Sequence, residues 1–143
     1  QGVILSESKQ NALATVETLQ TSGVKFVLQE YIEESKGTDI RAIVVDGVVV
    51  AAMKRTCKAG DFRSNLHRGG TSATVQLSYD EERVALKAAK ALRLAVCGVD
   101  ILQSDRGPLV LEVNSTPGLE GIETTTGKNI ARSIIGYLER NNR

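Results

Sequence analysis

Two stretches of sequence, Val99-Asp100-Ile101-Leu102 and Leu111-Glu112-Val113-Asn114, alternate acidic or amide side chains with apolar ones, as strands do. The segment between them contains Ser104-Asp105-Arg106-Gly107, which is typical of a type I turn followed by a glycine in the left-handed region. The two strands are therefore predicted to form a hairpin with a three-residue loop. In that register Asp100 lies directly opposite Glu112, with the asparagine further along the same face.

The facing carboxylates of Asp100 and Glu112 would repel each other and would lose hydration beside the apolar residues that flank them. A bound divalent cation relieves both costs. An oxygen set of Asp, Glu and Asn suits Mg²⁺, which usually keeps water and phosphate oxygens as its other ligands. Asp100, Glu112 and Asn114 are therefore candidate metal ligands. The alternative is a solvent-facing acidic surface, where most charged strand residues lie.

A second hairpin is predicted around Asp46-Gly47, a residue pair that strongly indicates a two-residue turn. A regular ladder from this turn places Asp39, Arg41 and Lys54 on one face of the hairpin and Arg55 on the other. The simplest interpretation is a cross-strand ion pair that contributes roughly a few tenths of a kcal/mol to stability. On geometry alone this interpretation is favoured over a functional one.

A long polar segment, residues 56–71, is predicted to be a loop because it is basic and rich in glycine. Residues 54–70 hold five Lys or Arg against one Asp. Such a loop suits charge-assisted hydrogen bonds to anionic oxygens. A solvated loop and a weak RNA-binding loop are the alternatives.

The rest of the chain mixes strand and helix patterns, which predicts an α+β architecture of antiparallel hairpins with flanking helices. Residues 115–121 are predicted to be a loop from their Pro and Gly content, and Asp80 is predicted to cap the helix that follows it. Strands are expected at 2–5, 26–32, 40–45, 48–53, 72–77, 97–103 and 109–114, and helices at 8–20, 81–95 and 128–140.

The composition is that of an ordinary globular protein, with 143 residues, 41% of them hydrophobic and 24% charged. No apolar run approaches the ~20 residues of a membrane helix, and no secretory signal is evident. A net charge of +1, with 3% aromatic residues and no tryptophan, argues against a nucleic-acid partner. One histidine argues against a zinc site, and the two cysteines are expected to be free thiols in a reducing cytoplasm.

Taken together, these motifs resemble the ATP-grasp superfamily and, within it, the RimK-type ligases that add glutamate to a ribosomal protein. The resemblance covers essentially the whole chain in order. The stretches that match are Gln29-Glu30-Tyr31-Ile32, Asp39-Ile40-Arg41, Met53-Lys54-Arg55, Phe62-Arg63-Ser64-Asn65-Leu66-His67-Arg68-Gly69-Gly70, Gly98-Val99-Asp100-Ile101-Leu102 and Glu112-Val113-Asn114-Ser115-Thr116-Pro117-Gly118-Leu119-Glu120-Gly121-Ile122-Glu123.

The resemblance implies a fold and a set of site residues. Residues 1–32 would be the remainder of the central ATP-grasp subdomain, and residues 33–143 the C-terminal catalytic subdomain. By position, the roles implied are Mg²⁺ ligands at Asp100, Glu112 and Asn114; adenine contacts at Glu30 and Tyr31; a further nucleotide contact at Asp39; and phosphate contacts at Arg63, Ser64 and Asn65. Arg55 and Arg41 are catalytic candidates that would steer a carboxylate or a phosphate.

The activity implied by the resemblance is ATP-dependent ligation with Mg²⁺ or Mn²⁺. A carboxylate would be activated as an acyl phosphate, and the amine of glutamate would then displace phosphate. The expected acceptor is the C-terminus of a small-subunit ribosomal protein in the cytoplasm, with homo-oligomerisation an open question. The family's phosphate-binding lysine and glycine-rich loop precede the matched region, so this chain alone is expected to be inactive. Two alternatives are a sister ligase for another amino acid and a non-catalytic nucleotide- or RNA-binding module.

Overall fold

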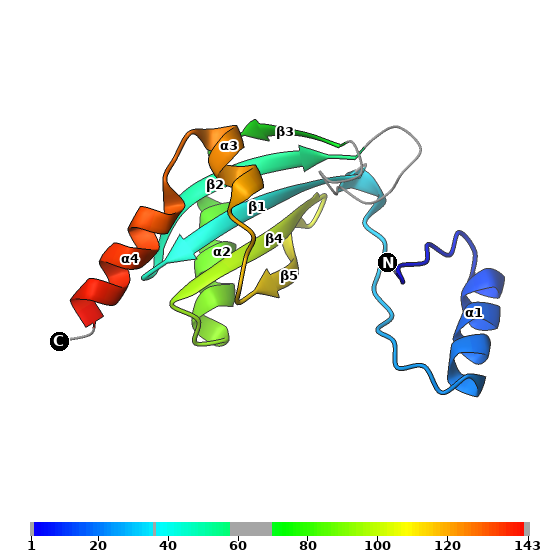
Figure 1. Ribbon diagram of the computed structural model, residues 1–143. Coiled ribbons are helices and arrows are strands. Elements are labelled where there is room, and N and C mark those ends of the chain that lie inside the picture. The colour runs from blue at the N-terminus through cyan, green and yellow to red at the C-terminus, as the bar shows by residue number, and fades with distance from the viewer. Residues whose placement is uncertain (1, 36, 58–69, 142–143) are drawn as a thin grey trace. The chain divides into compact units, whose positions relative to one another are not determined.

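The computed structural model describes residues 2–35, 37–57 and 70–141 (Figure 1). The chain divides into two compact units, Gln1–Tyr31 and Ile32–Arg143. The smaller unit contains helix α1 (Lys9–Thr21), which begins where the Ser8 hydroxyl accepts a hydrogen bond from the Asn11 amide. The predicted helix is confirmed, but the strands predicted at 2–5 and 26–32 are wrong. The reason is that a strand needs a hydrogen-bonded neighbour, and the described part of this unit provides none.

The larger unit is built on a five-stranded antiparallel sheet in the order β3-β2-β1-β4-β5. Its strands are β1 (Thr38–Val45), β2 (Val48–Thr56), β3 (Thr71–Thr74), β4 (Val96–Ser104) and β5 (Gly107–Asn114). A short 3₁₀ turn, η1 (Glu33–Ser35), leads into β1. Both predicted hairpins, β1–β2 and β4–β5, are therefore present, and the predicted α+β class is confirmed.

Helices cover both faces of this sheet (Figure 1). Helix α2 (Tyr79–Ala91) packs on one face, where the buried residues are Ile40, Ala42, Val44, Ala85, Ala89, Cys97, Val99 and Ile101. Helices α3 (Glu120–Thr126) and α4 (Ile130–Asn141) pack on the other, where the buried residues are Ile43, Val45, Ala51, Met53, Ile122 and Ile130. Along β1 the two sets alternate, as a strand covered on both faces requires.

A β-bulge in β2 makes the predicted register of the first hairpin wrong. The turn pairs Val44 with Val49 as a two-residue turn requires, but Ile43 pairs with Ala51, so that Val50 is an extra residue. The Lys128 ammonium donates a hydrogen bond of 2.9 Å to the carbonyl of Val50. Beyond the bulge every partner shifts by one residue, and a one-residue shift exchanges the faces of a strand.

The hairpin of β4 and β5 has the predicted pairing of Asp100 with Glu112, but its turn differs from the predicted one. Ser104 pairs with Gly107, which gives a two-residue turn where a three-residue loop was predicted. A register shift between Asp100 and Ile101 then restores the pairing of Asp100 with Glu112. The predicted opposition of the two carboxyl-bearing residues is therefore confirmed, although the predicted loop is wrong.

Helix α2 begins at a capping box, so the predicted cap at Asp80 is wrong. The Ser78 hydroxyl accepts from the Glu81 amide, and the Glu81 carboxylate accepts from the Ser78 amide and from the Gln103 side chain. Burial opposes the negative charge, but these hydrogen bonds and Lys54 hold the pKa of Glu81 below its ordinary value.

Three further differences from the predicted elements are small. Helix α2 ends four residues earlier than predicted, β3 is shorter than predicted, and part of the predicted loop at 115–121 belongs to α3. Within the described residues, no helix is long and apolar enough to cross a membrane.

Candidate functional site

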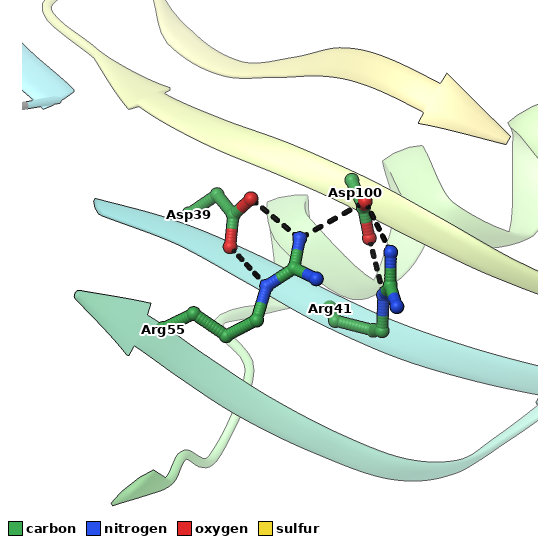
Figure 2. Close-up of polar contacts among 4 residues, drawn as sticks. All are labelled: Asp39, Arg41, Arg55 and Asp100. Atoms are coloured by element: carbon green, nitrogen blue, oxygen red, sulfur yellow. Dashed lines mark hydrogen bonds and ion pairs between the residues drawn. The ribbon is translucent and has the colours of Figure 1, made fainter. Parts of the chain in front are cut away.

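Four charged side chains meet on one face of the sheet (Figure 2). It is the face that α3 and α4 cover in part. Asp39 and Arg41 come from β1, and they continue the alternation that places Ile43 and Val45 on the same face. Arg55 comes from β2 and Asp100 from β4, which flank β1 on its two sides. Three neighbouring strands therefore bring together residues that are far apart in the sequence.

Arg55 binds Asp39 through two parallel hydrogen bonds. Its Nε donates to Oδ1 at 2.7 Å and its Nη2 donates to Oδ2 at 2.5 Å. Asp39 lies opposite Arg55 in the β1–β2 ladder, and the bulge in β2 produces this pairing. Asp39 is only 3% exposed, and the Arg55 side chain is 11% exposed. Such bidentate, charge-assisted pairs are the stronger class of hydrogen bond in proteins.

Asp100 is bound by both arginines (Figure 2). Nε of Arg41 donates to Oδ1 at 2.8 Å and Nη2 of Arg41 donates to Oδ2 at 2.6 Å. Nη2 of Arg55 donates to the same Oδ2 at 3.0 Å. Asp100 is 2% exposed, so its charge is compensated almost entirely by these two guanidinium groups.

The resulting cluster of Asp39, Arg55, Asp100 and Arg41 alternates in charge and is neutral in sum. Burial opposes the charge on Arg55, but its hydrogen bond to Asp39 and the charges of Asp100 and Asp39 keep its pKa above the ordinary value. A buried charged network is weak evidence for stability, because desolvation of the ions offsets much of their attraction. Its position at the polar end of an otherwise apolar face favours a functional interpretation.

Glu112 and Asn114 extend the polar face onto β5. Glu112 pairs with Asp100 and Asn114 pairs with Gly98, so both lie on the face that Asp100 occupies. Glu112 is exposed and Asn114 is half-buried, and neither side chain has a hydrogen bond or ion pair among the described residues. These two side chains are therefore available to a ligand, whereas Asp39 and Asp100 are already paired.

The loop that follows β5 passes close to Gly98 in β4. A Cβ atom on Gly98 would lie 2.9 Å from Cβ of Pro117, closer than real Cβ atoms come. Glycine is therefore required for the segment after Asn114 to cross β4 at this distance.

The oxygen atoms of three side chains at this site are suitable ligands for a hard divalent cation. Asp100, Glu112 and Asn114 offer two carboxylates and an amide oxygen on adjacent strands, the ligand types that Mg²⁺ prefers. The described residues contain no cluster of three or more His, Cys, Asp and Glu that could hold a metal ion, and the third candidate ligand here is an amide. Both oxygens of Asp100 are engaged by arginines in this structure.

The structure thus brings together six of the residues predicted from sequence, namely Asp39, Arg41, Arg55, Asp100, Glu112 and Asn114. Glu30 and Tyr31 lie in the smaller unit. Arg63, Ser64 and Asn65 lie outside the described residues. The direct pairing of Asp39 with Arg55 was not predicted, because no signal in the sequence locates the bulge at Val50.

Comparison with known proteins identifies the family. The model of the RimK-like ATP-grasp domain matches residues 1–138. The chain belongs to the RimK-like ATP-grasp family. Among curated relatives of this family, a probable alpha-L-glutamate ligase of Halorhodospira halophila is 54% identical over 98% of this chain. A protein of the same name from Azotobacter vinelandii is also 54% identical over 98% of this chain. In each case the chain covers 46% of the relative, so it spans about half the length of these proteins.

Solved ATP-grasp ligases share the fold of this RimK-like chain. The ligase PsnB, complexed with a precursor variant, Mg and ADP, aligns with a TM-score of 0.72 and 20% identity. That alignment covers 99% of this chain and 44% of PsnB. The D-alanine–D-alanine ligase of Bacillus anthracis, complexed with ATP, aligns with a TM-score of 0.68 and 23% identity, over 93% of this chain and 47% of the ligase. At these identities the similarity supports the fold alone.

Proposed function

We propose that this chain is the part of an ATP-dependent carboxylate–amine ligase that holds the metal-bound phosphates of ATP. The observation behind this proposal is the polar end of the sheet face, where the candidate metal ligands Asp100, Glu112 and Asn114 lie beside two arginines. Phosphoryl transfer needs mainly positioning and neutralisation of negative charge. Such a face offers both without a nucleophilic side chain.

Asp100, Glu112 and Asn114 would hold Mg²⁺, for which Mn²⁺ is a substitute. When bound, the cation neutralises charge on the phosphate oxygens of ATP. Glu112 and Asn114 are already open to such a ligand, and Asp100 would join them from the neighbouring strand. The match to the RimK-like ATP-grasp family and the two relatives' shared name support this use of the face.

Arg41 and Arg55 are proposed to contact the reacting carboxylate or phosphate oxygens. Each guanidinium has one nitrogen, Nη1, with no hydrogen bond among the described residues, so each can still donate to an anion. Asp39 is proposed to affect the nucleotide indirectly, since both of its oxygens hold Arg55. Glu30, Tyr31, Arg63, Ser64 and Asn65 remain proposed nucleotide contacts on the basis of family resemblance.

The reaction proposed has two steps. A carboxylate oxygen of the acceptor attacks the γ-phosphorus of ATP, the bond to the bridging oxygen breaks, and ADP leaves. The amine of the incoming amino acid then attacks the acyl carbon, loses a proton and displaces inorganic phosphate. The protein's task in both steps is to align the reactants and to stabilise charge on the phosphoryl oxygens.

The amino acid is proposed to be glutamate, which the names of the curated relatives support. The acceptor is proposed to be the C-terminus of a small-subunit ribosomal protein in the cytoplasm, which rests on the resemblance alone. Phosphate release by the enzyme that contains this chain, measured with glutamate and with lysine, tests the amino acid. Release with another amine and none with glutamate would exclude this assignment.

Calorimetric titration of ADP with Mn²⁺ into this chain tests the site itself. We expect saturable binding that depends on the metal and that Glu112→Ala abolishes. Glu139→Ala, which removes an exposed carboxylate on α4, is the matched control and should bind normally. Equal binding by the Glu112 variant would exclude the β4–β5 hairpin as the metal site.

A further inference from the structure

Resting on the metal site proposed above, we infer that Arg41 and Arg55 serve as built-in counter-ions of Asp100. A divalent cation then binds this face in exchange for Arg41, and the released guanidinium binds an anion. Arg41 thus offers its paired donors Nε and Nη2 to an anion only when the cation is present. The anion class is a phosphate or an acyl phosphate.

The hydrogen bonds of Asp100 are the first reason. A carboxylate offers about four acceptor positions, and three of those on Asp100 are used by the two arginines. A cation that enters at the fourth position would lie beside two positive guanidinium groups. Direct coordination by Asp100 therefore favours the departure of at least one arginine.

The second reason is that the two arginines are held differently. Arg55 donates from Nε and Nη2 to Asp39, so it keeps a bidentate partner when Asp100 is withdrawn. Arg41 donates from Nε and Nη2 to Asp100, and it has no other hydrogen bond or ion pair among the described residues. Arg41 is also the more exposed of the two, at 18% against 11%. Exchange therefore releases Arg41 and leaves Arg55 in place.

The third reason is the net charge of the face. Asp39, Asp100 and Glu112 set three negative charges against the two arginines, which leaves one net negative charge. A divalent cation reverses this to one net positive charge. The face then attracts an anion that it did not attract before, and the freed guanidinium offers paired donors suited to phosphate oxygens.

Titration of Mn²⁺ alone, without nucleotide, into this chain and into Arg41→Met tests the exchange. Removal of the competing guanidinium should tighten Mn²⁺ binding by about tenfold or more, a factor typical of one charged hydrogen-bonded pair. Arg140→Met is the matched control, because Arg140 pairs with Asp46 on the exposed surface, and it should leave the affinity unchanged. Adding Glu112→Ala to Arg41→Met should abolish the gained binding.

The outcomes separate this inference from the proposed function. If the unmodified chain and Arg41→Met bind Mn²⁺ with equal affinity, and Glu112→Ala abolishes binding in both, the exchange is refuted and the proposed metal site stands. Tighter binding that survives Glu112→Ala would place the cation elsewhere and refute both. No binding by Arg41→Met at millimolar Mn²⁺ would also refute the exchange, because that variant leaves Asp100 with fewer competitors.

A spectroscopic measurement on the unmodified chain avoids reliance on a variant that could unfold. In ¹⁵N–¹H spectra, the Nε–H signals of Arg41 and Arg55 report their hydrogen bonds separately, and Arg41→Lys assigns the first. Mg²⁺ should shift the Arg41 signal and speed its exchange with water, while the Arg55 signal changes little. Inorganic phosphate should then shift the Arg41 signal only with Mg²⁺ present. Unchanged Arg41 signals at saturating Mg²⁺, or an equal phosphate shift without Mg²⁺, would overturn the inference.

Discussion

Removal of one partner of the buried Asp39–Arg55 pair is predicted to destabilise the sheet unit, because the charge that remains loses most of its compensation. Asp39→Asn keeps the shape of the side chain but removes its charge and one of its two acceptor oxygens. Arg55 would then be left in a position where its side chain is 11% exposed. It would retain one hydrogen bond to residue 39 and its 3.0 Å contact with Asp100.

The magnitude follows from these contacts. A hydrogen bond to a charged group contributes about 1.5–3 kcal/mol, and breaking a fully buried ion pair costs about 3–5 kcal/mol. Because Arg55 keeps Asp100 as a partner, the loss should lie at the lower end. We expect Asp39→Asn to reduce the free energy of unfolding by about 2–3 kcal/mol.

The assay is urea denaturation followed by circular dichroism, with hydrogen exchange of the β1 and β4 amides to assign the transition to the sheet. Asp80→Asn is the control, since it breaks an exposed pair with Arg83 and should cost less than about 1 kcal/mol. The double variant Asp39→Asn/Arg55→Met should be less destabilised than the sum of the two single changes. Equal losses for Asp39→Asn and Asp80→Asn, or full additivity, would refute the reasoning.

Three further predictions concern other parts of the chain. Gly98→Ala should cost about 1–3 kcal/mol in thermal or urea unfolding, because the added Cβ would overlap Pro117. The folded pKa of Glu81 is lowered, so its stabilisation is present above the unfolded pKa and is lost as pH falls through the folded value. Urea unfolding of Glu81→Gln should therefore depend less on pH in the acid range. A thiol reagent at pH 8 should modify Cys57 faster than Cys97, which is fully buried and has its pKa raised by burial.

Each of these has a matched control. Gly118→Ala should be nearly neutral, since a Cβ there meets nothing within 4 Å, and an equal loss would contradict the steric argument. Glu82→Gln, at the exposed neighbouring position, should leave the pH dependence of the free energy of unfolding in the acid range unchanged. Cys97→Ser should retain the fast phase of thiol modification, and loss of that phase would show that Cys97 is the reactive thiol.

Local signals in the sequence were sufficient for most of the sheet. Asp46-Gly47 and Asp105-Arg106 lie at the two turns, and the alternation of apolar residues on either side of them gave four of the five strands nearly to their bounds. The predictions were wrong where an element depends on an interaction with another residue or strand. The extended segments at 2–5 and 26–32 have strand-like composition but no neighbouring strand among the described residues. Ser78 displaced Asp80 as the cap of α2 because Glu81 completes a capping box with it.

The sequence by itself determined the family, through its motifs, and the class of fold, since turn residues and strand alternation are local properties. It also predicted the six polar residues that the structure brings together at the candidate site. Only the tertiary structure decided which of these residues are partners. An extra residue at Val50 moves Arg55 to the face of Asp39, and a two-residue turn compensated by a second bulge keeps Asp100 opposite Glu112. Bulges arise from the packing and twist of whole strands, so they leave no short signal in the sequence. The ionic cluster therefore depends on register, which the complete sheet sets.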